Sequence, residues 1–246
     1  MDKLWHVGVT STSEAIIGQT IHADNLAKTS VPGFKATLII ERARPMYGEG
    51  LPSRVFVAAE SPGYDFSPGN MQYTDEPLDI AIANAGLFAV RGNDGVEGYT
   101  RRGDLHIDNG LLVNGDGDIV LGIKGPINIP PAQSIDIGED GAVNIVPLEN
   151  KDVTVCVGKI KLVNPDIKEL IKREDGLFAN KNNDVLPASL EVKIKPRTLE
   201  ASNVSAIGEM MAMMDLARAY ELSIKLMENA QENDRASAQL LQLKSS

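Results

Sequence analysis

The side chains that most often carry out chemistry are few and widely spaced in this chain. There are three histidines, His6, His22 and His106, and a single cysteine, Cys156. His6 and His22 lack the i, i+4 spacing that lets two histidines on one helix face bind zinc. The cysteine has no plausible base near it in sequence, and no Gly-x-Ser-x-Gly motif marks a nucleophilic serine. The reactive residues therefore predict no catalytic site, and an enzyme is not expected.

One acidic, glycine-rich stretch, NGDGDIVLGIKG at 114–125, partly resembles two kinds of ligand-binding loop. As a dinucleotide loop it has Val120 at the third glycine position, and a strand rather than a helix is expected to follow. As a calcium loop it has Ile119 where the turn needs glycine, and Gly125 where a glutamate should bind the ion. Turn formation explains the stretch better, so no metal and no cofactor is expected.

Charge and hydropathy argue against several other functions. With 34 acidic and 24 basic residues, the chain has a net charge of −10. Such a charge is unfavourable for binding nucleic acid or an anionic membrane surface. No apolar run approaches the ~18 residues that a membrane span requires, so no lipid-embedded segment is expected. The first residues, MDKLWHVGVTSTSEAIIG, lack the apolar core of a cleaved secretory signal.

The longest regular pattern is helical and lies near the C-terminal end. A 3–4 spacing of mostly apolar residues begins at Met210 and persists for about four heptads. Its first positions are Met210, Met213, Ala217, Tyr220, Ile224 and Met227. This methionine-rich stripe has three possible partners: the chain's own core, a ligand or other helices. Its length and terminal position favour helix–helix assembly, in which flexible methionines tolerate varied neighbours.

A weaker helical pattern occupies the N-terminal end. Trp5, Val9, Ile16, Ala23 and Leu26 fall on a 4–3 repeat with polar interruptions. The helix should end before VPGF at 31–34, because proline restricts the residue before it and the glycine can turn the chain. A single helix of this kind is marginal in water, so its apolar stripe needs a partner.

Between the helical segments the hydrophobic period changes to that of strands. Runs such as LDIAI, LFAV, IVLGI and LEVKI are separated by turn sequences that include Asp94-Gly95 and Asp140-Gly141. This pattern predicts a β domain, whereas the residues before it carry four prolines and predict an extended arm or irregular strands. The alternation in VTVCVG predicts a strand with Cys156 as a buried structural thiol.

The predicted fold class is therefore α+β. Long N- and C-terminal helices are expected to pair as a coiled-coil-like hairpin, with an intervening, mostly antiparallel all-β domain. The predicted parts are the N-terminal helix and its closing loop at 1–35, the arm at 36–75, the β domain at 76–196 and a C-terminal helix at 197–246 that packs with the first. Two paired helices would still leave apolar surface in water, so further subunits are expected to cover it.

Several blocks of this sequence resemble motifs of the flagellar axial proteins, the family of the rod, the hook and the hook–filament junction. NLAKTSVPGFKA at 25–36 is similar to the signature that closes the first helix of that family. PLDIAIANAGLFAV and GYTRRGDLHIDNGLLVNGDGDIVLG, at 77–90 and 98–122, resemble its shared β segment. LEASNVSAIGEMMAMMDLARAYELSIKLM at 199–227 resembles its closing helix.

This resemblance implies a structural subunit of the bacterial flagellar basal-body rod, with the proximal rod favoured over the distal rod or another hook or rod paralogue. Such proteins assemble helically with themselves and with other rod subunits, and form the drive shaft that links motor to hook across the periplasm. The flagellar type III export apparatus exports them without a cleaved signal. The resemblance also implies that Asn25, Leu26, Pro32, Gly33 and Phe34 fix the junction between helix and arm.

A second class of function stays open, a β-sheet binding adaptor that oligomerises through its terminal helices. On the rod hypothesis the helix stripes and the junction together form the assembly interface. Its predicted residues are Trp5, Val9, Ile16, Ala23, Asn25, Leu26, Pro32, Gly33, Phe34, Met210, Met213, Ala217, Tyr220, Ile224 and Met227.

Overall fold

The computed structural model describes residues 3–45, 55–60, 63–148, 153–182 and 184–243. The chain divides into two compact units, each assembled from segments that are distant in sequence. Unit 1 comprises Met1–Thr29, Ala36–Asp65 and Val204–Ser246, and unit 2 comprises Ser30–Lys35 and Phe66–Asn203.

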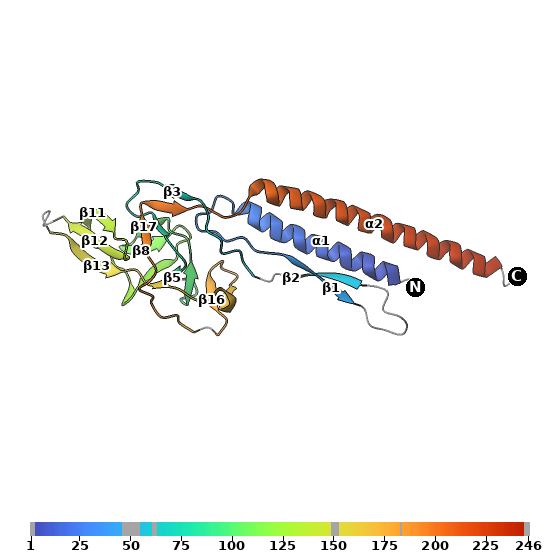
Figure 1. Ribbon diagram of the computed structural model, residues 1–246, viewed down its shortest axis with the longest axis horizontal. Helices are drawn as coiled ribbons and strands as arrows, with labels where there is room; N and C mark the ends of the chain where they lie inside the picture. Colours follow the sequence, from blue (N-terminus) through green and yellow to red (C-terminus); the bar gives the residue numbers. More distant parts are fainter. Residues whose placement is uncertain (1–2, 46–54, 61–62, 149–152, 183, 244–246) are drawn as a thin grey trace. The chain divides into compact units, whose positions relative to one another are not determined.

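Unit 1 contains two long helices and a two-stranded sheet (Figure 1). Its elements are α1 (Lys3–Ala27), β1 (Ile40–Pro45), β2 (Val55–Glu60) and α2 (Ala206–Leu243). The two strands pair antiparallel, and α1 contacts both α2 and β2. At about 1.5 Å per residue, the 38 residues of α2 extend for about 57 Å.

Local sequence signals set the ends of the helices. Ser205 precedes α2, and its Oγ accepts a hydrogen bond from the Gly208 amide at 3.3 Å. At the end of α1, Asp24 and Lys28 form an i, i+4 ion pair of 2.8 Å. Thr29 then closes a turn, because its hydroxyl donates back to the carbonyl of Leu26.

Within the described residues, the strands of unit 2 form antiparallel sheets of nine, three, two and two strands. The nine-stranded sheet has the order β15 (Leu170–Lys172), β16 (Phe178–Asn180), β6 (Glu97–Thr100), β5 (Leu87–Arg91), β9 (Ile119–Gly122), β8 (Leu111–Asn114) and β7 (Leu105–Asp108), with β10 (Gly125–Pro126) on β9 and β14 (Leu162–Val163) on β5. The three-stranded sheet has the order β11 (Ala132–Ile137), β12 (Ala142–Pro147) and β13 (Val155–Lys159). In the small sheets β4 (Ile80–Ile82) pairs with β17 (Ile194–Pro196), and β3 (Met71–Tyr73) pairs with β18 (Thr198–Glu200). A 3-10 turn, η1 (Ile167–Glu169), precedes β15.

One hydrophobic cluster joins the nine-stranded sheet, the three-stranded sheet and the β4–β17 pair. Ile82, Phe88, Leu112 and Val143, from four different strands, are each no more than 2% exposed. Predicted turns connect the strands, as at Gly95 between β5 and β6, where φ is 80°. Glycine adopts that conformation without the steric penalty that other residues meet.

The predicted fold class is wrong, and the finding that overturns it is the face through which the helices meet. Large apolar side chains were expected between them, but Trp5, Val9 and Ile16 are 49%, 46% and 51% exposed. In addition, residues 36–65 of the intervening region belong with the helices in unit 1 rather than with the remaining strands. The structure has two terminal helices and a large antiparallel β part, and the predicted domain boundaries stay a prediction.

Cys156 also differs from its prediction. It was expected to be buried, but its side chain is exposed. The reason is that β13 is an edge strand of the three-stranded sheet, so alternation along it does not imply burial on either face.

Candidate functional site

The two helices of unit 1 approach each other at small residues. A Cβ atom added to Gly8 would lie 2.5 Å from Cγ of Met227, and one added to Gly18 would lie 2.9 Å from a methyl carbon of Leu216. Residues later in α1 thus meet residues earlier in α2, so the helices are antiparallel (Figure 1). Glycine allows this close approach, and a larger residue at either position would separate the helices.

Polar pairs complete the contact between the helices. Ser11 Oγ and Ser223 Oγ are 2.9 Å apart, and either hydroxyl can donate. His22 Nδ1 lies 2.5 Å from Oε2 of Glu209.

Asn25 connects the end of α1 to the chain that returns beside it. Its side-chain amide donates to the Thr37 carbonyl, and its Oδ1 accepts from the Thr37 amide, each at 3.0 Å. The same amide group lies 3.4 Å from Oε1 of Glu209. Asn25 is only 1% exposed, and these hydrogen bonds satisfy its buried side chain near the end of α1.

The residues of the predicted assembly interface differ widely in exposure. Trp5, Val9, Ile16, Ala23, Met210 and Tyr220 are exposed. Leu26, Pro32, Met213, Ala217, Ile224 and Met227 are partly buried, whereas Asn25, Gly33 and Phe34 are buried. The structure brings only Asn25 and Met227 into the specific helix contacts described above, so the interface as a whole stays a prediction.

The closing loop, residues 30–35, is part of unit 2, and its glycine is required by geometry. Gly33 has φ of 68°, and its amide donates to the Glu200 carbonyl at 2.6 Å. A Cβ atom there would lie 2.3 Å from the carbonyl carbon of Arg101, which is a severe clash with backbone. Beside it the ring of Phe34 is buried, and the Lys172 ammonium lies 4.3 Å from the ring centroid.

A buried group of charges lies next to this loop, and we call Lys35, Arg101 and Glu200 the ionic cluster. Lys35 Nζ is 2.7 Å from Oε1 of Glu200, and Arg101 Nη1 is 2.9 Å from Oε2. The Gly69 amide also donates to Oε1 at 3.0 Å. The side chains of Lys35 and Glu200 are 0% exposed and that of Arg101 is 6% exposed. The cluster therefore links the closing loop, the segment before β3, the end of β6 and β18.

The remaining hydrogen-bonding groups of the cluster meet backbone carbonyls. Lys35 Nζ donates to Ser67 at 2.7 Å, and Arg101 donates through Nε to Gly86 and through Nη2 to Asn84, both at 2.8 Å. Burial by itself would raise the pKa of the Glu200 carboxyl, but the Lys35 hydrogen bond and the Arg101 charge outweigh burial and lower this pKa. Glu200 is thus held as a carboxylate.

Sequence reasoning missed the ionic cluster, although a signal was present. Each member lies in one of the quoted motif blocks: Lys35 in NLAKTSVPGFKA, Arg101 in GYTRRG and Glu200 in LEASNV. A charged residue at a fixed place in a motif of small and apolar residues indicates a specific partner. Which three charges meet depends on contacts across more than one hundred and sixty residues of chain.

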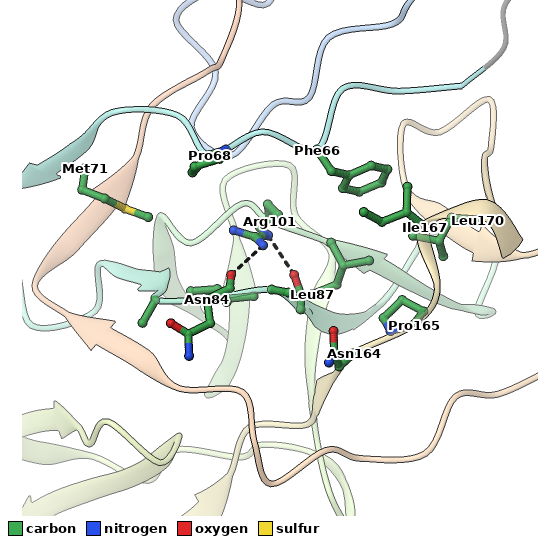
Figure 2. A pocket seen from close by; sticks show the side chains of 14 residues that line it. Phe66, Pro68, Met71, Asn84, Leu87, Arg101, Asn164, Pro165, Ile167 and Leu170 are labelled. Carbon is green, nitrogen blue, oxygen red and sulfur yellow. Dashed lines mark hydrogen bonds between the residues drawn. The ribbon is translucent and has the colours of Figure 1, made fainter.

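An open groove of about 350 Å³ lies beside Arg101 (Figure 2). Phe66, Met71, Leu87 and Leu170 contribute apolar side chains to its wall. The guanidinium of Arg101 is occupied by the carbonyls and by the carboxylate of the ionic cluster. The described lining residues include no nucleophile and no acid–base pair, so the groove is suited to contact rather than to catalysis.

Two absences in the described part of the chain bear on metals and membranes. No group of His, Cys, Asp and Glu side chains there is arranged to hold a metal ion. No helix there combines the length and the apolar character needed to cross a bilayer.

Comparison with known protein families defines the class of this protein. Residues 81–145 match the family described as flagellar hook protein FlgE/F/G D1 domain. Residues 195–240 match the family described as flagellar basal body rod FlgEFG protein C-terminal. These segments contain most of the nine-stranded sheet and most of α2. Fold and matches together define an axial protein of the flagellar rod and hook class.

Relatives that match along the whole chain narrow this class. FlgF of Escherichia coli (strain K12), a flagellar basal-body rod protein, is 35% identical over 99% of this chain and 100% of its own length. FlgF of Salmonella typhimurium (strain LT2) is 34% identical with the same coverage. FlgG of Bacillus subtilis (strain 168) is 34% identical, but over 65% of this chain and 64% of its own length. The chain belongs to the FlgF family of flagellar basal-body rod proteins, as its motifs predicted.

Proposed function

We propose that this chain builds the basal-body rod by packing the exposed apolar faces of α1 and α2 against neighbouring rod subunits. The neighbours are further copies of this chain and other axial proteins of the rod. The family identifies a structural subunit of the rod, and the helical arrangement and the choice of contact surface are our proposal. In this arrangement the subunits form the shaft that links motor to hook.

One observation carries the proposal: α1 meets Leu216 and Met227 of α2 through small residues, and both helices leave other large apolar residues exposed. On α2 the exposed fractions are 69% for Ile207, 61% for Met211 and 57% for Met214. On α1 the exposed fractions of Trp5 and Ile16 are 49% and 51%. Burial of apolar surface stabilises an interface by about 25 cal/mol per Å², so these faces favour association with further helices.

The symmetry of such a contact fits a filament. The exposed faces belong to two helices of different sequence, so a contact of one face with another joins unlike surfaces of two copies. Heterologous contacts between copies generate open helical arrays when the rotation between them does not close. Methionine supports this use, because its flexible thioether adapts to neighbours that differ in shape.

The proposal also covers partners and place. We infer that the protein passes through the flagellar type III export apparatus without a cleaved signal and lies in the part of the rod that crosses the periplasm. An intact mass of 26.5 kDa for the subunit isolated from basal bodies would support export without cleavage, whereas a shorter chain that begins inside α1 would contradict it.

The test of the assembly surface uses Met214→Asp. The side chain is 57% exposed, so a charge there should leave both units folded. In cells whose own gene for this protein is deleted, we expect the variant to be made and exported but to be at least tenfold depleted from isolated basal bodies. Met214→Leu is the matched control and should assemble normally. Normal incorporation of the Asp variant would refute the proposed surface.

A further inference from the structure

An open strand edge in unit 2 borders a second groove. One side of β13 pairs with β12. On the other side, the carbonyl of Lys159, the last residue of β13, accepts a hydrogen bond from the Ile123 amide of the β9–β10 hairpin at 3.0 Å. Between Val155 and Gly158 that side of β13 has no strand partner among the described residues. A groove of about 480 Å³ lies there, lined by residues 122–128 and 156–159. An incoming strand would continue the pairing that Ile123 begins.

Between Val153 and Gly158 this edge has only one of the features that usually protect a strand from pairing, an irregular register against β12 between Cys156 and Gly158. Proteins guard open edges with charges, prolines and bulges. The other edge of the same sheet, β11, follows Pro130 and Pro131 and has an irregular register between Ala132 and Ser134. The sequence VTVCV at 153–157 carries neither a charge nor a proline and consists mainly of strand-forming residues.

The charge of the groove restricts what it can accept. Lys124 and Lys159 line it, and no aspartate or glutamate is among its lining residues. Lys159 Nζ forms an ion pair with Oδ2 of Asp140 at 3.1 Å, whereas Lys124 is exposed to the solvent beside the groove. The chain itself has a net charge of −10. The groove therefore favours a strand with acidic residues, which another copy of this chain can supply.

Residues 184–191, DVLPASLE, have the required chemistry. They lie outside every strand, and Leu190 and Val185 are 83% and 66% exposed. Acidic residues flank the apolar ones at both ends of the segment. The Ser189 amide donates inward to Leu162 at 2.8 Å. The Leu186 amide donates to the Tyr99 hydroxyl at 2.8 Å, whereas the amides of Ala188 and Leu190 have no hydrogen-bond partner among the described residues and can pair with another strand.

We propose that the open edge of β13 accepts residues 184–191 of a neighbouring copy of this chain as an added strand. Backbone hydrogen bonds to β13 would hold the segment, as in other cases of strand addition. Val155 would contact its apolar side chains, and Lys124 would pair with one of its carboxylates. Donor and acceptor surfaces differ, so the contact is head-to-tail and can repeat along a filament. This inference rests on the proposed function, because it needs neighbouring copies in the rod.

The test is a cross-link between two distinguishable copies that are expressed together. The acceptor copy keeps its native Cys156, and an affinity tag marks it. The donor copy carries Cys156→Ser, so that it cannot act as acceptor, together with Leu190→Cys. Basal bodies are isolated and treated with a short bismaleimide, and tagged heterodimers are counted on denaturing gels. The matched control donor carries Val96→Cys instead, at a position that is 54% exposed and lies outside the groove.

We expect at least ten times more heterodimer with the Leu190→Cys donor than with the Val96→Cys donor. A Val155→Lys substitution in the acceptor places a charge on the edge and should lower the yield at least tenfold, whereas Val155→Thr should preserve it. Equal yields from both donors, or a yield that Val155→Lys does not change, would overturn the strand-docking site. If Met214→Asp still blocks incorporation in that case, the proposed function stands and only this site falls.

Discussion

Replacing Glu200 with alanine should destabilise unit 2 far more than a change in a surface ion pair. The carboxylate accepts hydrogen bonds from Lys35, Arg101 and the Gly69 amide, and its side chain is 0% exposed. Without it, two buried cations would face each other with no carboxylate between them. Removing one partner of a buried ion pair typically costs about 3–5 kcal/mol. We expect a loss in this range in the free energy of unfolding.

Two further variants provide reference values for the loss in unfolding free energy expected of Glu200→Ala. Glu200→Gln keeps the shape and one acceptor oxygen but loses the charge, so it should cost about 1.5–3 kcal/mol, the value of hydrogen bonds to charged groups. Asp140→Ala removes an ion pair with Lys159 whose side chains are 35% and 63% exposed. Exposed pairs contribute about 1 kcal/mol or less. The expected order of destabilisation is Glu200→Ala, then Glu200→Gln, then Asp140→Ala.

The pH dependence follows from the lowered pKa of Glu200. A carboxyl whose pKa is lower in the folded than in the unfolded protein adds stability above its unfolded pKa, and the contribution is lost as pH falls through the folded pKa. Its ordinary value is 4.5, so this contribution should be complete at neutral pH and should disappear on acidification below that value. In Glu200→Gln this part of the acid sensitivity should be missing.

The assay must report on unit 2 alone, because the helices form a separate unit. Hydrogen exchange of backbone amides in β5 and β18, followed by mass spectrometry over a range of urea concentrations, meets this requirement. If Glu200→Ala lowers the stability of these strands no more than Asp140→Ala does, the ionic cluster does not hold the closing loop and the reasoning fails. An equal loss of stability on acidification in wild type and in Glu200→Gln would refute the pH argument.

The remaining predictions concern unit 1. Gly18→Leu should push α2 away, because even a Cβ atom there would lie 2.9 Å from Leu216. Overpacking of this kind costs about 1–3 kcal/mol. When helix content is followed by circular dichroism on heating, its loss should therefore begin at a lower temperature in Gly18→Leu than in Gly18→Ala. Asn25→Ala removes both hydrogen bonds to Thr37 and should cost about 1–3 kcal/mol. Limited proteolysis should then cut near the end of α1 in the variant, and unchanged cleavage would contradict the role given to Asn25.

The sequence predicted both helices correctly but placed the wrong face of α1 against α2, for a physical reason. Along α1 the positions Gly8, Ser11, Ala15 and Gly18 follow the same 3–4 spacing as the large apolar residues do. Ala15 is 5% exposed, and the neighbouring Ile16 is 51% exposed. A periodic pattern shows that a face is buried somewhere, but it does not distinguish a partner in the same chain from one in another subunit.

Other features of the fold could be predicted only in part. Turn sequences such as Asp94-Gly95 have a local cause, so the turns of the β part were predictable. The exposure of Cys156 was not, because a central strand and an edge strand share the same alternation. The ionic cluster depends on Lys35, Arg101 and Glu200 meeting from distant segments, and no local pattern encodes that contact. Their places in family motifs indicated importance without indicating partners.

A rod subunit must hold the chain that leads to each of its helices and must also bind neighbouring subunits. The ionic cluster serves the first task, and the exposed apolar helix faces serve the second. Lys35 follows the end of α1 at Ala27, and Glu200 precedes the start of α2 at Ala206, so the chain leading to each helix is tied to one buried cluster. The large apolar faces are not needed for that attachment and remain available to neighbours. Loss of the cluster should therefore weaken unit 2 and assembly together, whereas Met214→Asp should weaken assembly and leave unit 2 unchanged. A variant of Glu200 that unfolds early yet assembles normally would show that attachment and assembly are independent.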